Sequence, residues 1–103
     1  MVIKWTNKAS LRLQSIHDYY QEVSNGKVAK NIIKEILNAT KILSKYPQIA
    51  AVEPYLNNSP QVYRSLVVKP DYKIIYFIDG ENIVIATIWN CRQNPENMRA
   101  DVE

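Results

Sequence analysis

The sequence predicts an α+β fold in which a helix hairpin packs on one face of a largely antiparallel sheet, in the order β-α-α-β-β-β. Three observations lead to this prediction. The second half of the chain contains three apolar runs rich in β-branched and aromatic residues, separated by short turn segments. The first half contains two segments with helical periodicity. The length of 103 residues is that of one domain, so we expect a single domain over residues 1–103.

The chain begins with a short extended segment, Val2–Trp5, which leads to Thr6 and Asn7. Both are good N-cap residues, because a side-chain oxygen can accept a hydrogen bond from a free N–H of the first helical turn. Apolar residues then recur at three- and four-residue spacing, which predicts one buried helical face. They are Ala9, Leu13, Ile16, Tyr20 and Val23. Ser24-Asn25-Gly26 should end this helix, with the Gly or Asn in the left-handed conformation of many C-caps.

A second helix is predicted from Lys27 to Lys45, where the apolar period is clearest. Tyr46-Pro47 ends it, because proline restricts the residue before it. Its buried stripe should consist of Ala29, Ile32, Ile33, Ile36, Leu37, Thr40 and Leu43. Its lysines are largely off that stripe, namely Lys27, Lys30, Lys34, Lys41 and Lys45. With a short turn between them, the two helices are expected to form an antiparallel hairpin.

A proline-containing loop, Gln48–Gln61, leads into the three strands of a predicted antiparallel meander. The runs are Val62–Val68, Tyr72–Ile78 and Ile83–Trp89. Lys69-Pro70-Asp71 joins the first two, and an Asp-Gly turn within residues 79–82 joins the last two. Asp-Gly between two such runs is a strong hairpin signal, because the turn needs residues that tolerate positive φ.

Side chains alternate between the two faces of a strand, and here both faces carry large apolar groups. In the last run we expect one face to hold Ile83, Ile85, Thr87 and Trp89, and the other to hold Val84, Ala86 and Ile88. A sheet with one solvated face would alternate more cleanly. The second face should therefore be covered by a curled sheet, by the C-terminal tail or by a partner protein.

Composition limits the chemistry. The net charge of +3 and pI of about 9.0 fit an acidic partner, either nucleic acid or an acidic protein segment. The only cysteine is Cys91 and the only histidine is His17, so we expect no disulfide, no zinc site and no bound metal. No glycine-rich phosphate loop is present, and no cofactor is expected. No signal peptide or membrane span is recognisable, so we expect a cytoplasmic protein without a membrane partner.

The candidate functional residues are three cations in or just past the meander: Arg64, Lys73 and Arg92. Arg64 and Lys73 lie on adjacent predicted strands, and Arg92 lies where the last strand ends. Grouped guanidinium and ammonium ions bind phosphate or acidic peptide well. We therefore predict that these three side chains meet at one edge of the sheet and form the working surface.

The ordered set of motifs resembles the RelE/ParE toxin superfamily, the toxic components of bacterial type II toxin–antitoxin modules of the plasmid stabilisation type. The resemblance covers nearly the whole chain. It rests on Trp5, Ala9, Leu13, Ile16 and Tyr20, on Pro47, on Tyr63-Arg64, on Tyr72–Tyr76, on Ile83–Ile85 and on Arg92–Pro95. It implies a compact sheet with two helices on one side, growth inhibition, and a cognate antitoxin that wraps and neutralises the toxin.

One branch of the superfamily, the RelE-like branch, cleaves messenger RNA on the ribosome by moving a ribose 2′-OH onto the neighbouring phosphate. The resemblance implies that Arg64, Lys73 and Arg92 would be the catalytic cations of such an endoribonuclease. Two departures count against it. Met98 stands where the branch has a proton-transferring Tyr or His, and Leu66 stands where a second lysine is expected. Lys73 also replaces an arginine, and Glu96 is the remaining acid–base candidate nearby.

The ParE-like branch inhibits DNA gyrase and needs no nuclease site. In that case the three cations would bind the target. The missing proton-transfer groups favour this interpretation, with the ribonuclease second and a catalytically inactive antitoxin-binding module third.

Overall fold

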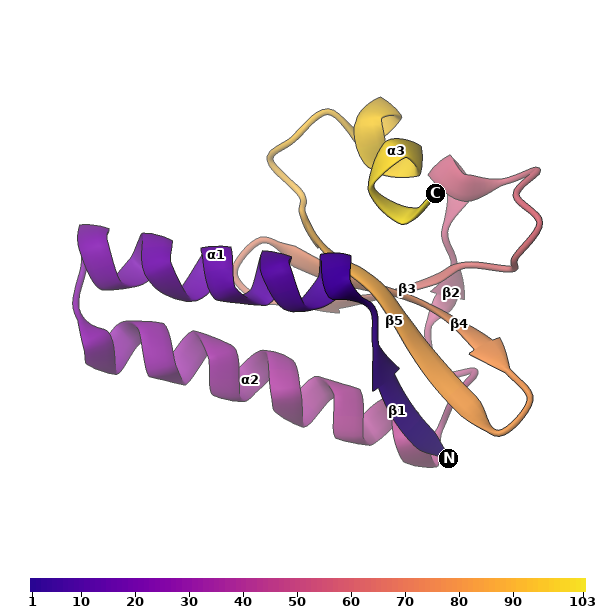
Figure 1. Ribbon diagram of the computed structural model, residues 1–103, viewed down its shortest axis with the longest axis horizontal. Helices are drawn as coiled ribbons and strands as arrows, with labels where there is room; N and C mark the ends of the chain where they lie inside the picture. The colour runs from indigo at the N-terminus through magenta and orange to yellow at the C-terminus, as the bar shows by residue number, and fades with distance from the viewer.

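The computed structural model describes residues 1–103 and contains a five-stranded sheet with a helix hairpin on one face and a short C-terminal helix on the other (Figure 1). The elements are β1 (Val2–Trp5), α1 (Asn7–Val23), α2 (Gly26–Lys45), β2 (Ala51–Val52), the 3-10 turn η1 (Pro54–Leu56), β3 (Arg64–Val68), β4 (Tyr72–Asp79), β5 (Asn82–Asn90), the 3-10 turn η2 (Pro95–Asn97) and α3 (Met98–Val102). The strand order is β1-β5-β4-β3-β2, and only β1 runs parallel to its neighbour, β5. The predicted α+β fold is confirmed. No helix is long and apolar enough to span a bilayer.

The two long helices begin at the caps that the sequence predicts. The Thr6 hydroxyl accepts a hydrogen bond from the Ala9 N–H at 3.1 Å, and the Asn25 side chain accepts one from the Val28 N–H at 2.9 Å. The predicted left-handed C-cap is wrong, because Ser24 and Asn25 have φ of −135° and −161°. Asn25 is instead the N-cap of α2, which requires an extended backbone, and Gly26 is the first residue of that helix.

The main core lies between the hairpin and the sheet. It contains Ala9, Ile16, Ile36, Leu43, Ala50, Val68, Tyr72, Ile74, Tyr76, Ile83, Ile85 and Ile88. Val23 and Leu37 were expected to be buried but are 58% and 39% exposed. Val23 ends α1 in the part of the hairpin that extends beyond the sheet, so no strand is there to cover it (Figure 1).

A second, smaller core fills the opposite face of the sheet. The C-terminal tail and η1 cover this face, and coverage by the tail is one of the three alternatives that the sequence predicts. The buried residues are Leu56, Tyr63, Ile75, Ala86, Trp89 and Met98. Neither α3 nor the strand and turn within the loop at residues 48–61 were predicted, because elements of two to five residues are too short to show a period.

A β-bulge in β5 changes which way its side chains point. Tyr76 lies opposite Ile85 and Ile75 lies opposite Thr87, so Ala86 is an extra residue. Beyond the bulge the alternation shifts by one position, which places Thr87 and Trp89 on the tail side of the sheet and Ile88 in the main core. The predicted grouping of Ile83 and Ile85 with Thr87 and Trp89 is therefore wrong.

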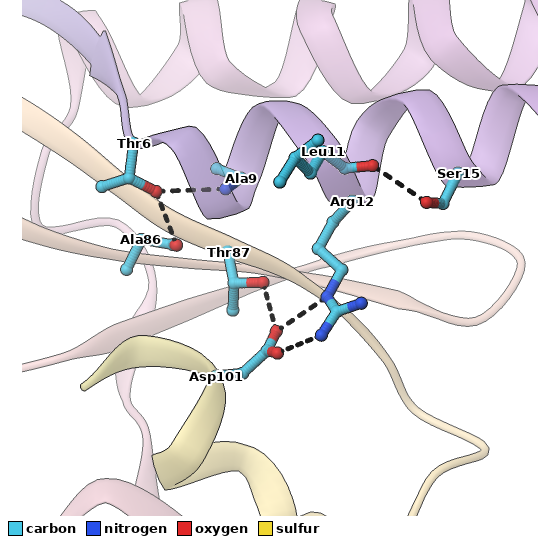
Figure 2. Close-up of polar contacts among 8 residues, drawn as sticks. All are labelled: Thr6, Ala9, Leu11, Arg12, Ser15, Ala86, Thr87 and Asp101. Atoms are coloured by element: carbon cyan, nitrogen blue, oxygen red, sulfur yellow. Dashed lines mark hydrogen bonds and ion pairs between the residues drawn. The ribbon is translucent and has the colours of Figure 1, made fainter.

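Thr6 satisfies the carbonyl groups at this bulge. Its N–H donates to the Ile85 carbonyl at 3.1 Å, and its hydroxyl donates to the Ala86 carbonyl at 2.8 Å (Figure 2). The same hydroxyl caps α1, so one side chain fixes the start of the helix against the bulge. The bulge thereby determines both the position of α1 and the residues that face the C-terminal tail.

Gly80 in the β4–β5 turn has φ of +59°, a left-handed conformation that other residues adopt at a cost. We expect Gly80→Ala to lower the free energy of unfolding by about 1 kcal/mol. Gly26→Ala is the matched control, because Gly26 is helical and an added Cβ would meet nothing closer than the Gln21 side chain at 3.8 Å. Urea denaturation of both variants tests this, and equal effects would contradict it.

Candidate functional site

Lys73 forms an ion pair with a fully buried carboxylate. Its Nζ lies 2.8 Å from Glu53 Oε1, and the Glu53 residue is 0% exposed. Burial alone would raise the pKa of Glu53, but the Lys73 hydrogen bond and the Tyr55 N–H, which donates to Oε2 at 2.9 Å, hold that pKa below its usual range. Within the fold, Lys73 therefore serves as the counter-ion of Glu53.

Arg64 forms a hydrogen bond with the segment that follows α2. Its Nη1 donates to the Ala50 carbonyl at 2.7 Å. Tyr76, directly opposite Arg64 in the β3–β4 ladder, donates its hydroxyl to the Pro47 carbonyl at 2.7 Å. These two contacts fix the backbone between α2 and β2, so the Arg64 side chain also has an internal role.

Arg92 is the most accessible of the three predicted site residues. It follows β5 by two residues, and its Nη2 lies 2.8 Å from Asp71 Oδ2 in the β3–β4 turn. The Arg92 side chain is 73% exposed. An exposed pair of this kind contributes only about 0–1 kcal/mol, so the guanidinium can exchange Asp71 for a partner at little cost.

The predicted convergence of the three cations on one edge is wrong. In the β3–β4 ladder Arg64 lies opposite Tyr76, whereas Lys73 lies opposite Val67. Residues that lie opposite each other share a face, and Tyr76 and Lys73 are an odd number of positions apart. Arg64 therefore points to the helix side and Lys73 to the tail side, and Arg92 lies beyond the strands.

Arg92 lines a cleft of about 310 Å³ where α1 meets the ends of β4 and β5 and the C-terminal tail. Its walls carry both charge and aromatic surface, from Arg12, Tyr19, Tyr20, Asp71, Tyr72, Trp89, Asn90, Arg92, Gln93 and Asp101 among others. Burial, together with the Tyr20 hydroxyl, raises the pKa of Tyr72, so this phenol stays protonated. The cleft therefore offers hydrogen-bond donors, aromatic ring faces and Arg92, which can leave Asp71 for another anion at little cost.

Arg12 and Asp101 line the side of this cleft near α3, and they form a partly buried network with Thr87 (Figure 2). Arg12 binds both carboxylate oxygens of Asp101, and its Nε lies 3.2 Å from Oδ2. The Thr87 hydroxyl donates to the same Oδ2 at 2.5 Å. Burial would raise the pKa of Asp101, but these donors lower it below its usual value. The network therefore joins α1, β5 and α3.

This network could not be predicted from the sequence, because Arg12 and Asp101 are 89 residues apart and neither belongs to a recognisable motif. Two further residues bear on proton transfer. Met98 is fully buried in the smaller core under the C-terminal tail, and Glu96 is exposed in η2. His17 Nδ1 lies 3.3 Å from Asp18 on the surface of α1, and burial raises the pKa of the Cys91 thiol. No group of three His, Cys, Asp or Glu residues is placed to hold a metal ion.

Comparisons with known proteins give a consistent result. The model of the family described as "ParE toxin of type II toxin-antitoxin system, parDE" matches residues 3–95. A solved structure described as "Chromosomal ParDE TA system from P. aeruginosa" resembles the chain with a TM-score of 0.74 and 25% sequence identity. The match covers 87% of this chain and 95% of that one. No curated protein matches the sequence.

Proposed function

The chain belongs to the ParE toxin family of type II toxin–antitoxin systems, and we propose that it arrests growth by inhibiting DNA gyrase until a cognate antitoxin neutralises it. The toxin class and the existence of an antitoxin partner follow from the family and from the similar ParDE structure. The gyrase target is what the resemblance to the ParE-like branch implies. This target would require the toxin to act in the cytoplasm.

The separation of Arg64, Lys73 and Arg92 is the observation that favours gyrase over messenger RNA as the target. Cleavage of messenger RNA requires cations around one phosphate and groups that move two protons. Here Arg64 and Lys73 lie on opposite faces of the sheet, and each has an internal acceptor. Met98, at the position expected for a proton donor, is a buried thioether. Inhibition of gyrase requires only a binding surface, and this arrangement can supply one.

Within that surface we assign target contact to Arg92 and supporting roles to Arg64 and Lys73. Arg92 is exposed, its ion pair is weak, and it borders the cleft of charged and aromatic side chains at the end of the sheet. Arg64 and Lys73 instead hold the segment between α2 and η1 in place. All three residues matter in this proposal, but only Arg92 meets the target directly.

The proposal is tested with the purified toxin in two parallel assays. We expect concentration-dependent inhibition of gyrase supercoiling that added antitoxin reverses, and no cleavage of messenger RNA on ribosomes. Cleavage without an effect on gyrase would establish the ribonuclease instead. Neither activity, with antitoxin binding retained, would establish an inactive binding module.

Arg92→Ala is expected to raise the toxin concentration for half-inhibition of supercoiling about tenfold, since loss of one charged contact costs about 1.4 kcal/mol of binding. Asp71→Ala is the matched control, because it breaks the same ion pair but leaves the guanidinium in place. It should keep inhibition close to that of the wild type. Equal loss in both variants would show that the pair matters only for local structure.

A further inference from the structure

The five lysines of α2 form one straight stripe on the outer surface of the hairpin. They are Lys27, Lys30, Lys34, Lys41 and Lys45, and all five are exposed. At 3.6 residues per turn they fall within a sector of about 60°, and at 1.5 Å per residue the stripe is about 27 Å long. The sector lies opposite the buried face of the same helix, which contains Ala29, Ile36, Thr40 and Leu43.

These charges are not neutralised within the fold. None of the five lysines takes part in an ion pair. The only acid of α2, Glu35, lines a separate groove facing Leu66, Val67 and Val68 of β3. Because the whole chain has a net charge of +3, the remainder of the molecule is slightly acidic and the positive charge is concentrated on this helix. Lysines three and four residues apart repel one another, so the stripe does not serve the stability of the helix.

We propose that the α2 lysine stripe binds the phosphate backbone of duplex DNA, so that the toxin holds the DNA engaged by its enzyme target as well as the enzyme. The role at gyrase rests on the proposed function; the DNA contact itself does not. Lysines that neutralise phosphates gain affinity by releasing counterions. The polar residues interspersed with them, Asn31 and Asn38, carry amide N–H groups that also donate to phosphate oxygens.

A linear polyanion fits the stripe better than an acidic protein segment does. A protein segment needs apolar anchors, and the nearest apolar surface is a groove lined by His17, Ile33 and Leu37. That groove borders Lys30, Lys34 and Lys41, whereas Lys45 adjoins a separate pocket with Tyr46, Pro47 and Ile49, so the apolar contacts form no continuous track along the stripe. The phosphate backbone of DNA can meet positive charge along the whole stripe and needs no apolar anchor.

The test measures binding of the purified toxin to a labelled duplex of about 20 base pairs by fluorescence anisotropy, in a series from about 50 to 200 mM salt. The test variant replaces all five lysines by Gln, which keeps the helix propensity but removes the charge. It should bind at least about thirtyfold more weakly at low salt, and its salt dependence should be shallower by about one unit of slope per engaged lysine.

Two controls accompany it. Replacing the same five lysines by Arg should preserve DNA binding, because the charge is kept. Replacing Lys4 and Lys8 by Gln, both exposed and outside α2, should leave DNA binding nearly unchanged. Circular dichroism and urea denaturation verify that every variant is folded.

Failure of wild-type toxin to bind DNA at low salt, or equal affinity of the Gln variant, would overturn the inference. So would a Gln variant that loses affinity for the antitoxin but keeps its affinity for DNA, since the stripe would then be an antitoxin site. Supercoiling inhibition is measured separately on wild-type toxin. Inhibition without DNA binding refutes only this inference, and DNA binding without inhibition refutes only the gyrase proposal.

Discussion

Replacing Lys73 by Met is expected to lower the free energy of unfolding by about 3 kcal/mol, since removing one partner of a buried ion pair leaves an uncompensated charge. Glu53 is 0% exposed, and its Oε1 would lose the ammonium group now 2.8 Å away. The Tyr55 N–H would remain as a donor to Oε2, and it cannot balance a full charge. Urea denaturation at pH 7 measures the effect.

The control is the double variant Glu53→Gln/Lys73→Met, which removes both charges and keeps the shape of both side chains. It should recover most of the lost stability, because the penalty of the single variant comes from the stranded carboxylate. A single variant within about 0.5 kcal/mol of wild type, a difference typical of surface substitutions, would show that the pair does not support the fold.

The effect should also depend on pH. The pKa of Glu53 is lowered in the folded protein, so its pair with Lys73 stabilises the fold fully above the unfolded-state pKa of about 4.3. That contribution is lost as the pH falls through this value towards the lower folded-state pKa. Wild type should therefore lose its advantage over Lys73→Met on acidification, and denaturation at about pH 7 and pH 4 tests this.

The same variants separate structure from function at Lys73. If this residue acts only as the counter-ion of Glu53, the double variant should inhibit gyrase as well as wild type does. A folded double variant with no inhibition would instead assign Lys73 a direct contact with the target. Stability measurements and supercoiling assays on the one pair of variants thus decide between the two roles.

The long elements could be predicted from the sequence because each carries its own local signal. Thr6 and Asn25 precede strong apolar periods, and β-branched runs flank the Asp79-Gly80 turn. The bulge at Ala86 could not be predicted in this way. Assigning faces by alternation assumes that the strand contains no inserted residue. The inserted Ala86 instead places Thr87 and Trp89 on the face covered by the C-terminal tail.

The site was less predictable because its partners are distant in the sequence. The sequence indicates Arg64, Lys73 and Arg92 as cations of the meander, but not that Ala50, Glu53 and Asp71 accept from them. Alternation assigns Arg64 to the face of Leu66 and Lys73 to the face of Ile75, but only the strand register, with Arg64 opposite Tyr76, shows that these are opposite faces of the sheet. Membership of adjacent strands is thus insufficient to infer a shared site.

Replacing Asp101 by Ala is expected to cost about 2–3 kcal/mol of unfolding free energy and to loosen α3. The Thr87 hydroxyl is 0% exposed and would lose its acceptor, which costs about 1–3 kcal/mol. Arg12 would lose both its contacts, but its side chain is 45% exposed and regains water, so its share is smaller. The measurements are urea denaturation and tryptophan emission, recorded in a Trp5→Phe background so that it reports on Trp89 alone. Trp89 is 4% exposed in the core covered by α3, and its emission should shift to the red.

Glu103→Ala is the matched control, because Glu103 lies beside α3 and its pair with Arg99 is 40% exposed on both sides. It should change the stability by less than about 0.5 kcal/mol and leave the Trp89 emission unaltered. An Asp101→Ala variant equal to this control would show that α3 is held by Met98 packing and by the Arg99 contacts with Ser59 and Asn57, without help from Asp101. The expected larger effect would mean that one carboxylate maintains the wall of the cleft beside Arg92, so this variant should also weaken gyrase inhibition although Asp101 itself is buried.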